Sequence, residues 1–290
     1  MKINFTKMHG LGNDFMVIDA INQSISLFPA QIKKLADRHF GVGFDQLLLV
    51  ERAEDSKNDF KYRIFNADGS EVGQCGNGAR CFTRFVIEKK LTNKEVGEHI
   101  FVETKEGVIE LLVIDHDRNM TINHKAIWSP EHIIVMVDMG KPIWHPKDIP
   151  FRQLENDKAT YTVENKEVGV VSIGNPHAVL IVDDINKEIE PIAKKIQSSA
   201  DFPEGVNVNF VKIVDEFNIK LRVYERGVGE TLACGSGACA TVVYLGKKGK
   251  IDGKKSTIVE FKGGRLLVGF DKSILMMGPA ESVFEGQVEV

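Results

Sequence analysis

Two cysteines stand in matching sequence contexts, one in each half of the chain. Cys75 and Cys234 each open a Cys-Gly-x-Gly-Ala run, each follows a glutamate by four residues, and they lie 159 positions apart in a chain of 290. Such a run is typical of a helix start, where unsatisfied N–H groups and the helix dipole favour a thiolate and can bind a carboxylate. We therefore expect two thiols of lowered pKa that face each other across a cleft.

Two thiols on opposite faces of one carbon can invert a stereocentre. One thiolate removes the α-proton from one face, and the opposing thiol returns a proton from the other face. This chemistry needs no cofactor, and the helix starts would hold the α-carboxylate.

The four cysteines, Cys75, Cys81, Cys234 and Cys239, also allow other interpretations. A structural disulfide is disfavoured in a reducing compartment, and a zinc site prefers more closely spaced cysteine pairs. Spacing alone does not decide between a metal or disulfide clip and a reactive pair. The repeated motif favours a reactive pair, with Cys81 and Cys239 as small buried helix residues.

Polar landmarks recur at nearly the same offset as the cysteines. Gly12-Asn13 matches Gly174-Asn175 at an offset of 162, Gln46 matches Asn207 at 161, and Asn66 matches Glu225 at 159. These residues fall at strand ends or turns of the expected elements. The pattern indicates an internal duplication, with two similar domains related by pseudo-twofold symmetry and a small-ligand site in the cleft between them.

The composition is that of an ordinary soluble globular protein. Hydrophobic residues make up 43% and charged residues 27% of the chain, and the net charge is −4. No basic tract indicates nucleic-acid binding, and no apolar run is long enough to span a membrane. The first residues lack the apolar stretch of a signal peptide, so a cytoplasmic location is expected.

Hydrophobic periodicity predicts strands at 2–8 and 14–19 joined by a tight turn, and helices at 29–40 and 185–199. The helix after Cys75 has one apolar face and basic residues elsewhere. The segment after Cys234 is apolar nearly all round, so a curved sheet should enclose it. The polar stretch 115–123 is a plausible crossing between domains.

Other candidates have two interpretations each. His177 follows Gly174-Asn175-Pro176 and is either a turn histidine or a functional one, while His9 is expected to be structural. Arg226 is either one half of a solvated ion pair or a clamp for a carboxylate, which its bidentate geometry suits.

The motifs together resemble those of the diaminopimelate epimerases, in order and along the whole chain. They are 9–15, 43–46, 66–70, 74–80, 174–177, 225–227 and 233–238. The resemblance implies interconversion of LL- and meso-2,6-diaminopimelate, in lysine and peptidoglycan-precursor synthesis, without pyridoxal phosphate or metal. It also implies Cys75 and Cys234 as the acid/base pair, with His177 and Glu225 linked to catalysis. The residues implied in substrate binding are Asn13, Gln46, Asn66, Gly76, Asn77, Asn175, Asn207, Glu225, Arg226, Gly235 and Ser236.

The fold implied is α/β, an α+β roll of two similar domains, each a curved sheet around a central helix. We expect one domain at 1–120 plus 279–290, carrying Cys75, and another at 121–278, carrying Cys234. Members of the family form homodimers through a C-terminal aromatic, often Tyr, after a Gly-Pro-Ala turn. Here the aligned residue is Phe284, which keeps the ring and lacks the hydroxyl.

Two rival functions remain open at this point. An enzyme of the same fold could racemise a single-headed amino acid such as proline or histidine, although the many amides and Arg226 favour a substrate with two amino-acid ends. A thiol–disulfide redox protein could use Cys75 and Cys234, in which case activity would require oxidation.

Overall fold

The computed structural model describes residues 1–73, 75–114, 121–122, 125–129, 132–152 and 159–290. The chain divides into a first unit, Met1–Asp138 with Met277–Val290, and a second unit, Met139–Met276. The sequence placed this boundary at 120/121. In the structure the boundary falls after Asp138, because strand β10 (Ile134–Asp138) pairs antiparallel with β7 (Gly107–Ile114) of the first unit. The expected domain crossing at 115–123 lies almost entirely outside the described residues.

The elements of the first unit are β1 (Lys2–Gly10), β2 (Asn13–Asp19), α1 (Pro29–Ala36), β3 (Gln46–Arg52), β4 (Phe60–Asn66), β5 (Glu71–Val72), α2 (Gly76–Glu88), β6 (His99–Thr104), β7, β8 (Thr121–Ile122), β9 (Lys125–Ala126), β10 and β20 (Glu281–Glu289). The elements of the second unit are a 3₁₀ turn (Pro146–Asp148), β11 (Thr160–Val163), β12 (Lys166–Ser172), β13 (Pro176–Ile181), α3 (Glu190–Gln197), β14 (Asn207–Ile213), β15 (Asn218–Glu225), β16 (Gly229–Thr231), α4 (Gly235–Lys247), β17 (Thr257–Phe261) and β18 (Gly264–Phe270). Strand β19 (Ile274–Pro279) ends the second unit and begins the last segment of the first.

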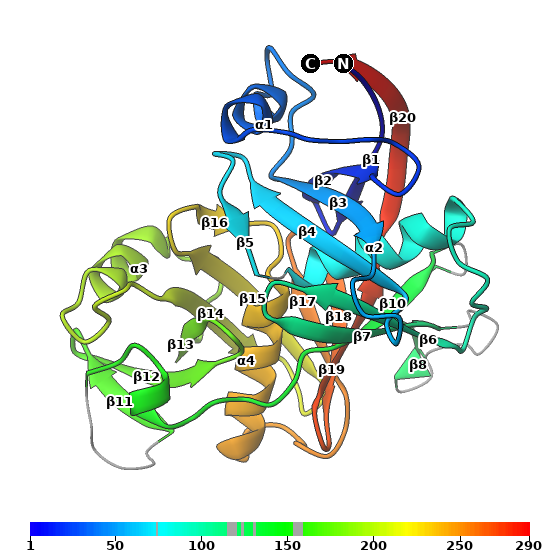
Figure 1. The fold of residues 1–290 in the computed structure, drawn as a ribbon. Helices are drawn as coiled ribbons and strands as arrows, with labels where there is room; N and C mark the ends of the chain where they lie inside the picture. The colour runs from blue at the N-terminus through cyan, green and yellow to red at the C-terminus, as the bar shows by residue number, and fades with distance from the viewer. Residues whose placement is uncertain (74, 115–120, 123–124, 130–131, 153–158) are drawn as a thin grey trace. The chain divides into compact units, whose positions relative to one another are not determined.

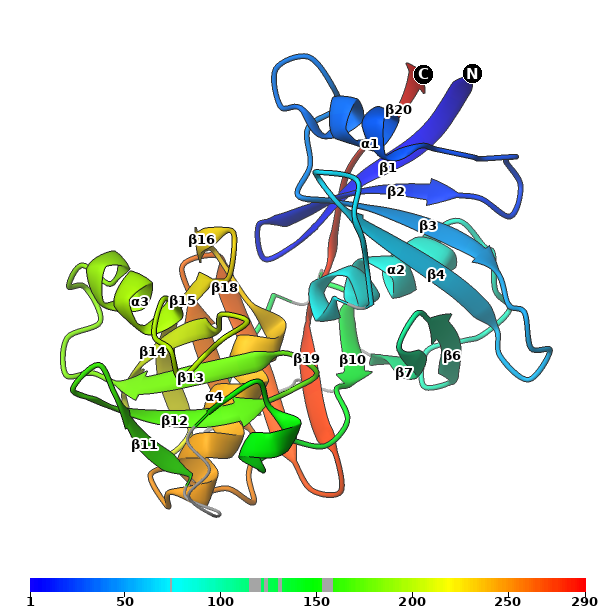
Figure 2. The ribbon, with the colours of Figure 1, turned by 60° about the vertical axis from the view of Figure 1, so that its left-hand side comes forward.

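The two units repeat one pattern of strand pairing (Figures 1 and 2). In the first, β1–β2 is antiparallel, β2–β3 parallel, β3–β4 antiparallel, β4–β6 parallel and β6–β7 antiparallel. In the second, β12–β13, β13–β14, β14–β15, β15–β17 and β17–β18 follow the same sequence of senses. The duplication expected from the sequence is therefore present in the topology, and the predicted class, two similar mixed α/β units, is confirmed.

A helix that begins at a cysteine lies against the sheet of each unit. Cys75 and Cys234 are the N-cap residues of α2 and α4, both in the extended conformation. Nearly every residue of α4 from Gly235 to Leu245 is buried, and the helix packs on β12, β13, β14 and β18. This is the enclosed helix that its all-round apolar sequence predicts.

Helix α2 differs from the expectation of a basic outer face. Arg80 is fully buried, and its Nε donates to the carbonyl oxygen of Pro279 at 3.1 Å. Arg84 lies nearby and is only 14% exposed in its ion pair with Glu281 at 2.8 Å. The C-terminal segment supplies these oxygen partners, which a reading of the helix alone could not foresee.

The core of the first unit lies on both faces of its sheet. Met16 and Ile18 of β2 pack in the cluster with Ile32 and Leu35 of α1. Phe15 points to the opposite face, where a Cβ on Gly78 of α2 would meet its ring at 3.3 Å. Strand β2 is apolar at successive positions because helices cover both of its faces.

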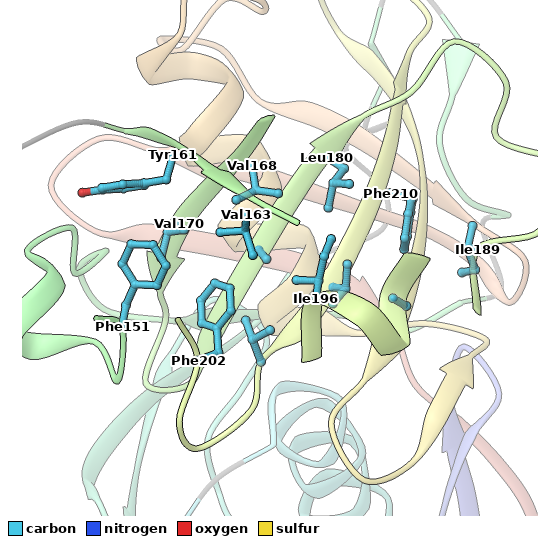
Figure 3. Close-up of a cluster of buried hydrophobic side chains, with 14 of the residues drawn as sticks. Phe151, Tyr161, Val163, Val168, Val170, Leu180, Ile189, Ile196, Phe202 and Phe210 are labelled. Carbon is cyan, nitrogen blue, oxygen red and sulfur yellow. The ribbon is translucent and has the colours of Figure 1, made fainter. Parts of the chain in front are cut away.

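The second unit has a matching cluster beneath α3 (Figure 3). Ile196 of α3 packs with sheet residues such as Val170 and Phe210, and Phe151 and Phe202 close the cluster. Helix α3 begins at Glu190, later than the predicted 185, because Pro191 fits the first turn of a helix. Helix α1 ends at Ala36, earlier than the predicted residue 40, where Val42 and Gly43 donate backbone hydrogen bonds to Leu35.

Across the described ranges, no helix is long and apolar enough to cross a membrane.

Candidate active site

A two-residue turn positions Asn13 in the first unit. Leu11 and Gly12 both have positive φ angles, 57° and 89°, as a type I′ hairpin turn requires. The turn joins β1 to β2 and makes Asn13 the first residue of β2. Its side chain is therefore held at the end of the sheet by a rigid connection.

Asn13 lies beside Cys75. Oδ1 of Asn13 is 3.8 Å from the Sγ of Cys75 and accepts a hydrogen bond from Nδ2 of Asn77 at 3.2 Å. The backbone N–H of Cys75 faces the hydroxyl of Tyr62 at 3.5 Å. The structure thus brings Asn13, Cys75 and Asn77 together, as three of the predicted site residues.

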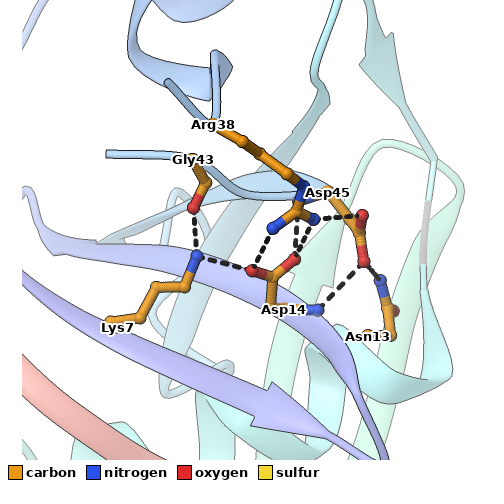
Figure 4. A network of polar contacts seen from close by, with 6 residues as sticks. All are labelled: Lys7, Asn13, Asp14, Arg38, Gly43 and Asp45. Carbon is orange, nitrogen blue, oxygen red and sulfur yellow. Dashed lines mark hydrogen bonds and ion pairs between the residues drawn. The ribbon is translucent and has the colours of Figure 1, made fainter. Parts of the chain in front are cut away.

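A network of charged side chains fixes the orientation of the Asn13 side chain (Figure 4). Nδ2 of Asn13 donates to Oδ2 of Asp45 at 3.0 Å, which leaves Oδ1 turned toward Cys75. Arg38 bridges Asp45 and Asp14, and Lys7 binds both Asp14 at 2.6 Å and the carbonyl oxygen of Gly43. Burial alone would raise the pKa of Asp14, but hydrogen bonds from Arg38 and Lys7 outweigh it and hold that pKa well below its usual value.

Gln46 and Asn66 form a second pair in the first unit. They lie opposite each other in the β3–β4 ladder, and Nε2 of Gln46 donates to Oδ1 of Asn66 at 3.0 Å. Gln46 is also the partner of Phe15 in the β2–β3 ladder, two residues from Asn13.

The second unit surrounds Cys234 with oxygen atoms. Its Sγ lies 3.2 Å from Oε2 of Glu225 and 3.6 Å from Oγ of Ser236. The other carboxylate oxygen of Glu225 accepts from the hydroxyl of Thr231 at 2.5 Å. These bonds fix the Glu225 carboxylate against the sulfur.

The prediction of a lowered thiol pKa is wrong for Cys234. Burial, above all, and the negative charge of Glu225 raise the pKa of Cys234 well above its ordinary value, although Ser236 and the backbone N–H of Gly237 act in the opposite direction. The helix start is present, but desolvation of a thiolate beside a carboxylate outweighs it. Cys234 is therefore a thiol at neutral pH.

His177 is fully buried and contacts Ser236. Its Nε2 lies 3.0 Å from Oγ of Ser236 and 3.0 Å from Oδ1 of Asn175, and its Nδ1 lies 3.2 Å from Oδ1 of Asn209. Burial lowers the pKa of His177 to about 4, so the ring is neutral at neutral pH. His177 is thus part of the Cys234 cluster rather than an isolated turn residue.

Asn207 and Arg226 make a separate contact in this unit. Oδ1 of Asn207 accepts from the backbone N–H of Arg226 at 3.0 Å, and its Nδ2 donates to the carbonyl of Pro176 at 3.2 Å. The guanidinium of Arg226 donates to the carbonyl oxygen of Glu204 at 2.7 Å. The partner of Arg226 in this bond is a backbone carbonyl, so the bond is not the solvated ion pair that the sequence suggests as one role for Arg226.

The second glycine of each Cys-Gly-x-Gly turn has a packing role. A Cβ on Gly78 would lie 3.1 Å from Ile64, and one on Gly237 would lie 3.0 Å from Val223. Each glycine lets its helix start approach the sheet closely.

The comparisons with known proteins identify the family of the chain. The family model for diaminopimelate epimerase matches residues 5–144 and 169–283. The diaminopimelate epimerase of Nitrosomonas europaea is 50% identical over 300 residues, and that of Pseudomonas savastanoi pv. phaseolicola 47% over 298, each across 100% of both chains.

The chain belongs to the diaminopimelate epimerase family.

As a member of this family the chain is an isomerase. Solved structures of more distant proteins share its fold. A hydroxyproline epimerase from Agrobacterium vitis has a TM-score of 0.68 at 15% identity and covers 99% of this chain and 92% of its own. A PhzF-family phenazine biosynthesis protein from Bacillus anthracis has a TM-score of 0.67 at 18% identity, over 100% of both chains.

Sequence reasoning missed several residues that hold the site of this family member. Asp45 orients Asn13, Thr231 braces Glu225, and Asn209 contacts His177. Asp45 sits within one of the recognised motifs, whereas Asn209 lies two residues after Asn207, on the same face of β14, and could have been found by strand alternation. Within the described ranges, no group of acidic, histidine or cysteine side chains could hold a metal ion.

Proposed function

We propose that the protein interconverts LL- and meso-2,6-diaminopimelate by a two-base mechanism that uses one cysteine of each unit. The observation that carries this proposal is the pair of equivalent helix starts, each with a cysteine at its N-cap. Each unit contributes one thiol, and Cys234 has the carboxylate of Glu225 beside its sulfur.

The proton transfers follow from the state of Cys234. Because its thiol is protonated at rest, Cys234 gives its proton to one face of the α-carbon. Cys75 must then start as the thiolate and take the α-proton from the opposite face. After one turnover the two states are exchanged, so the reverse reaction uses Cys234 as the base.

The negative charge that develops on the substrate moves into the α-carboxylate. The backbone N–H groups of Gly76 and Asn77 in α2, and of Gly235 and Ser236 in α4, lie in the first turn of each helix and would bind that carboxylate. Neither a metal nor pyridoxal phosphate is required by this scheme.

The rest of the site suits the second amino-acid end of the substrate. Asn66 and Asn207 offer side-chain oxygens for an ammonium group, and Arg226 offers a guanidinium for a carboxylate. Arginine has five N–H donors, so the bond to Glu204 leaves others available.

A homodimer through β20 and a cytoplasmic location complete the proposal. Phe284 and Val283 are 49% and 55% exposed on β20, and the ring of Phe284 packs edge-on to Phe5 at 6.0 Å. An exposed aliphatic and aromatic pair on an ordered strand suits an interface between two copies.

The test is an assay of the purified protein on LL-diaminopimelate beside proline, hydroxyproline and histidine. We expect meso-diaminopimelate to form and the single-headed amino acids to remain unchanged. Cys75→Ser and Cys234→Ser should each lose nearly all activity, while Cys81→Ala, a buried cysteine of the same helix as Cys75, should retain it. Conversion of proline in preference to diaminopimelate would overturn the proposed substrate.

A further inference from the structure

Asn209 links His177 to helix α4. The residue is fully buried on β14. Its Nδ2 lies 3.0 Å from the carbonyl oxygen of Gly237 and 3.1 Å from Oγ1 of Thr241, and its Oδ1 lies 3.2 Å from Nδ1 of His177.

Thr241 determines which way this amide points. Its single hydroxyl hydrogen goes to the carbonyl of Gly237 at 2.7 Å, so toward Asn209 the hydroxyl oxygen only accepts. The Gly237 carbonyl also only accepts. Both groups therefore require the NH₂ of Asn209, and hydrogen-bond chemistry alone fixes the orientation of the amide.

The oxygen of Asn209 must then face the histidine ring. Because an amide oxygen only accepts, Nδ1 of His177 carries the ring proton and Nε2 presents a lone pair. We propose that Asn209, oriented by Thr241, is a positioning residue that holds His177 in the Nδ1–H tautomer and presents its Nε2 lone pair to Ser236. The role of this tautomer in catalysis rests on the proposed function.

This tautomer controls the hydrogen of Ser236. The hydroxyl donates to Nε2 of His177 at 3.0 Å rather than to the sulfur of Cys234 at 3.6 Å. Oδ1 of Asn175 also lies 3.0 Å from this nitrogen, so the proposed tautomer requires the amide of Asn175 to turn over and present its NH₂ there. In this tautomer the hydroxyl hydrogen of Ser236 is directed away from Cys234, so the lowering effect that a hydrogen bond from Ser236 has on the pKa of Cys234 is withheld. The resting thiol keeps the proton that it must donate.

The opposite tautomer would have the opposite effect. With the proton on Nε2, His177 would donate to Ser236, and the hydroxyl hydrogen of Ser236 would turn to the sulfur of Cys234. A thiolate would gain a hydrogen bond, and Cys234 would lose part of its preference for the protonated state.

Selective ¹⁵N-histidine labelling tests the tautomer in the resting protein. Long-range ¹H–¹⁵N spectra at neutral pH distinguish a protonated ring nitrogen from one with a lone pair, and His177→Gln identifies the His177 signals. We expect Nδ1 protonated and Nε2 unprotonated. A protonated Nε2 in the wild-type protein would overturn the proposal, whatever the variants do.

Three variants test the cause. Asn209→Leu removes the acceptor for Nδ1 and should move the ring proton to Nε2, and Thr241→Val should give a mixture of the two tautomers. Thr83→Val is the matched control, since Thr83 makes the same bond to the fourth preceding carbonyl, Ala79, at 2.9 Å in α2. It should leave the His177 spectrum unchanged, and circular dichroism verifies folding of each variant.

Site-resolved alkylation with iodoacetamide at one fixed pH gives a second measurement. Cys234 should react about fivefold faster in Asn209→Leu, the factor that corresponds to one hydrogen bond of ordinary net strength. Cys75 serves as the internal reference. An unchanged Nδ1–H tautomer in folded Asn209→Leu would overturn the proposal. Neither measurement needs turnover, so failure of the protein to epimerise diaminopimelate would refute the proposed function and leave this one standing.

Discussion

The sulfur of Cys234 lies 3.2 Å from Oε2 of Glu225, inside the fold and at the start of α4. Burial above all opposes ionisation of the thiol and raises its pKa, and a carboxylate this close opposes ionisation further. The same carboxylate can receive the thiol proton or return it. Glu225 is therefore placed to keep Cys234 ready as a proton donor.

Glu225→Gln should weaken this control. The neutral amide keeps the shape of the side chain but removes the negative charge, so the pKa of Cys234 should fall while burial still keeps it raised. We expect faster alkylation of Cys234 at pH 8 and a loss of kcat of about 10²–10⁴-fold, the range for an acid–base group. Glu230→Gln is the control, because Glu230 pairs with Arg222 at 2.7 Å and should not affect Cys234.

Asp45→Ala should disturb Cys75 through Asn13. The variant removes the acceptor that holds Nδ2 of Asn13, so Oδ1 is no longer directed at Cys75. We expect kcat to fall about tenfold, in line with the loss of one hydrogen bond to a charged group. Asp19→Ala, at the far end of β2, removes a carboxylate that accepts hydrogen bonds from Ile21 and Asn22 and should leave kcat unchanged. Equal losses in both variants would refute a specific role for Asp45.

The buried histidine predicts a pH dependence of stability. The pKa of His177 is about 4 in the folded protein and near 6.5 in the unfolded chain, which therefore binds more protons between these values. The free energy of unfolding should fall as the pH drops from about 6.5 to 4, by on the order of 3 kcal/mol from this residue. Urea unfolding at several pH values should show this component in the wild-type protein and its loss in His177→Gln.

The proposed dimer depends on Phe284. Replacing it by Asp puts a charge into the apolar patch on β20, and the dissociation constant should rise at least about tenfold. Sedimentation analysis at several concentrations measures the change. Phe40→Asp, at a phenylalanine that is 89% exposed outside β20, should leave the mass unchanged.

The fold could be predicted because its signals are local and repeated. The apolar helix after Cys234, the hairpin turn before Asn13 and the matched offsets between halves all specify structure without knowledge of distant contacts. The second glycines of the two turns reinforce this, because only glycine allows the close approach seen at Gly78 and Gly237.

The electrostatics of the site could not be predicted in the same way. The raised pKa of Cys234 depends on its burial and on Glu225, which lies nine residues away at the end of β15. Arg80 resembles an exposed helix residue until the C-terminal segment covers it and Pro279 accepts its hydrogen bond. Such effects arise from tertiary contacts, and no local pattern in the sequence indicates which distant segments will meet.

Deuterium incorporation tests the two-base mechanism most directly. The protein is incubated in D₂O with protiated LL-diaminopimelate, and substrate and product are analysed early in the reaction. Because one thiol takes the α-proton and the other supplies a solvent-derived one, the meso product should carry one deuterium at the inverted carbon while the remaining LL substrate carries none. Deuterium entering both pools at the same rate, or a meso product without deuterium, would contradict the two-base mechanism.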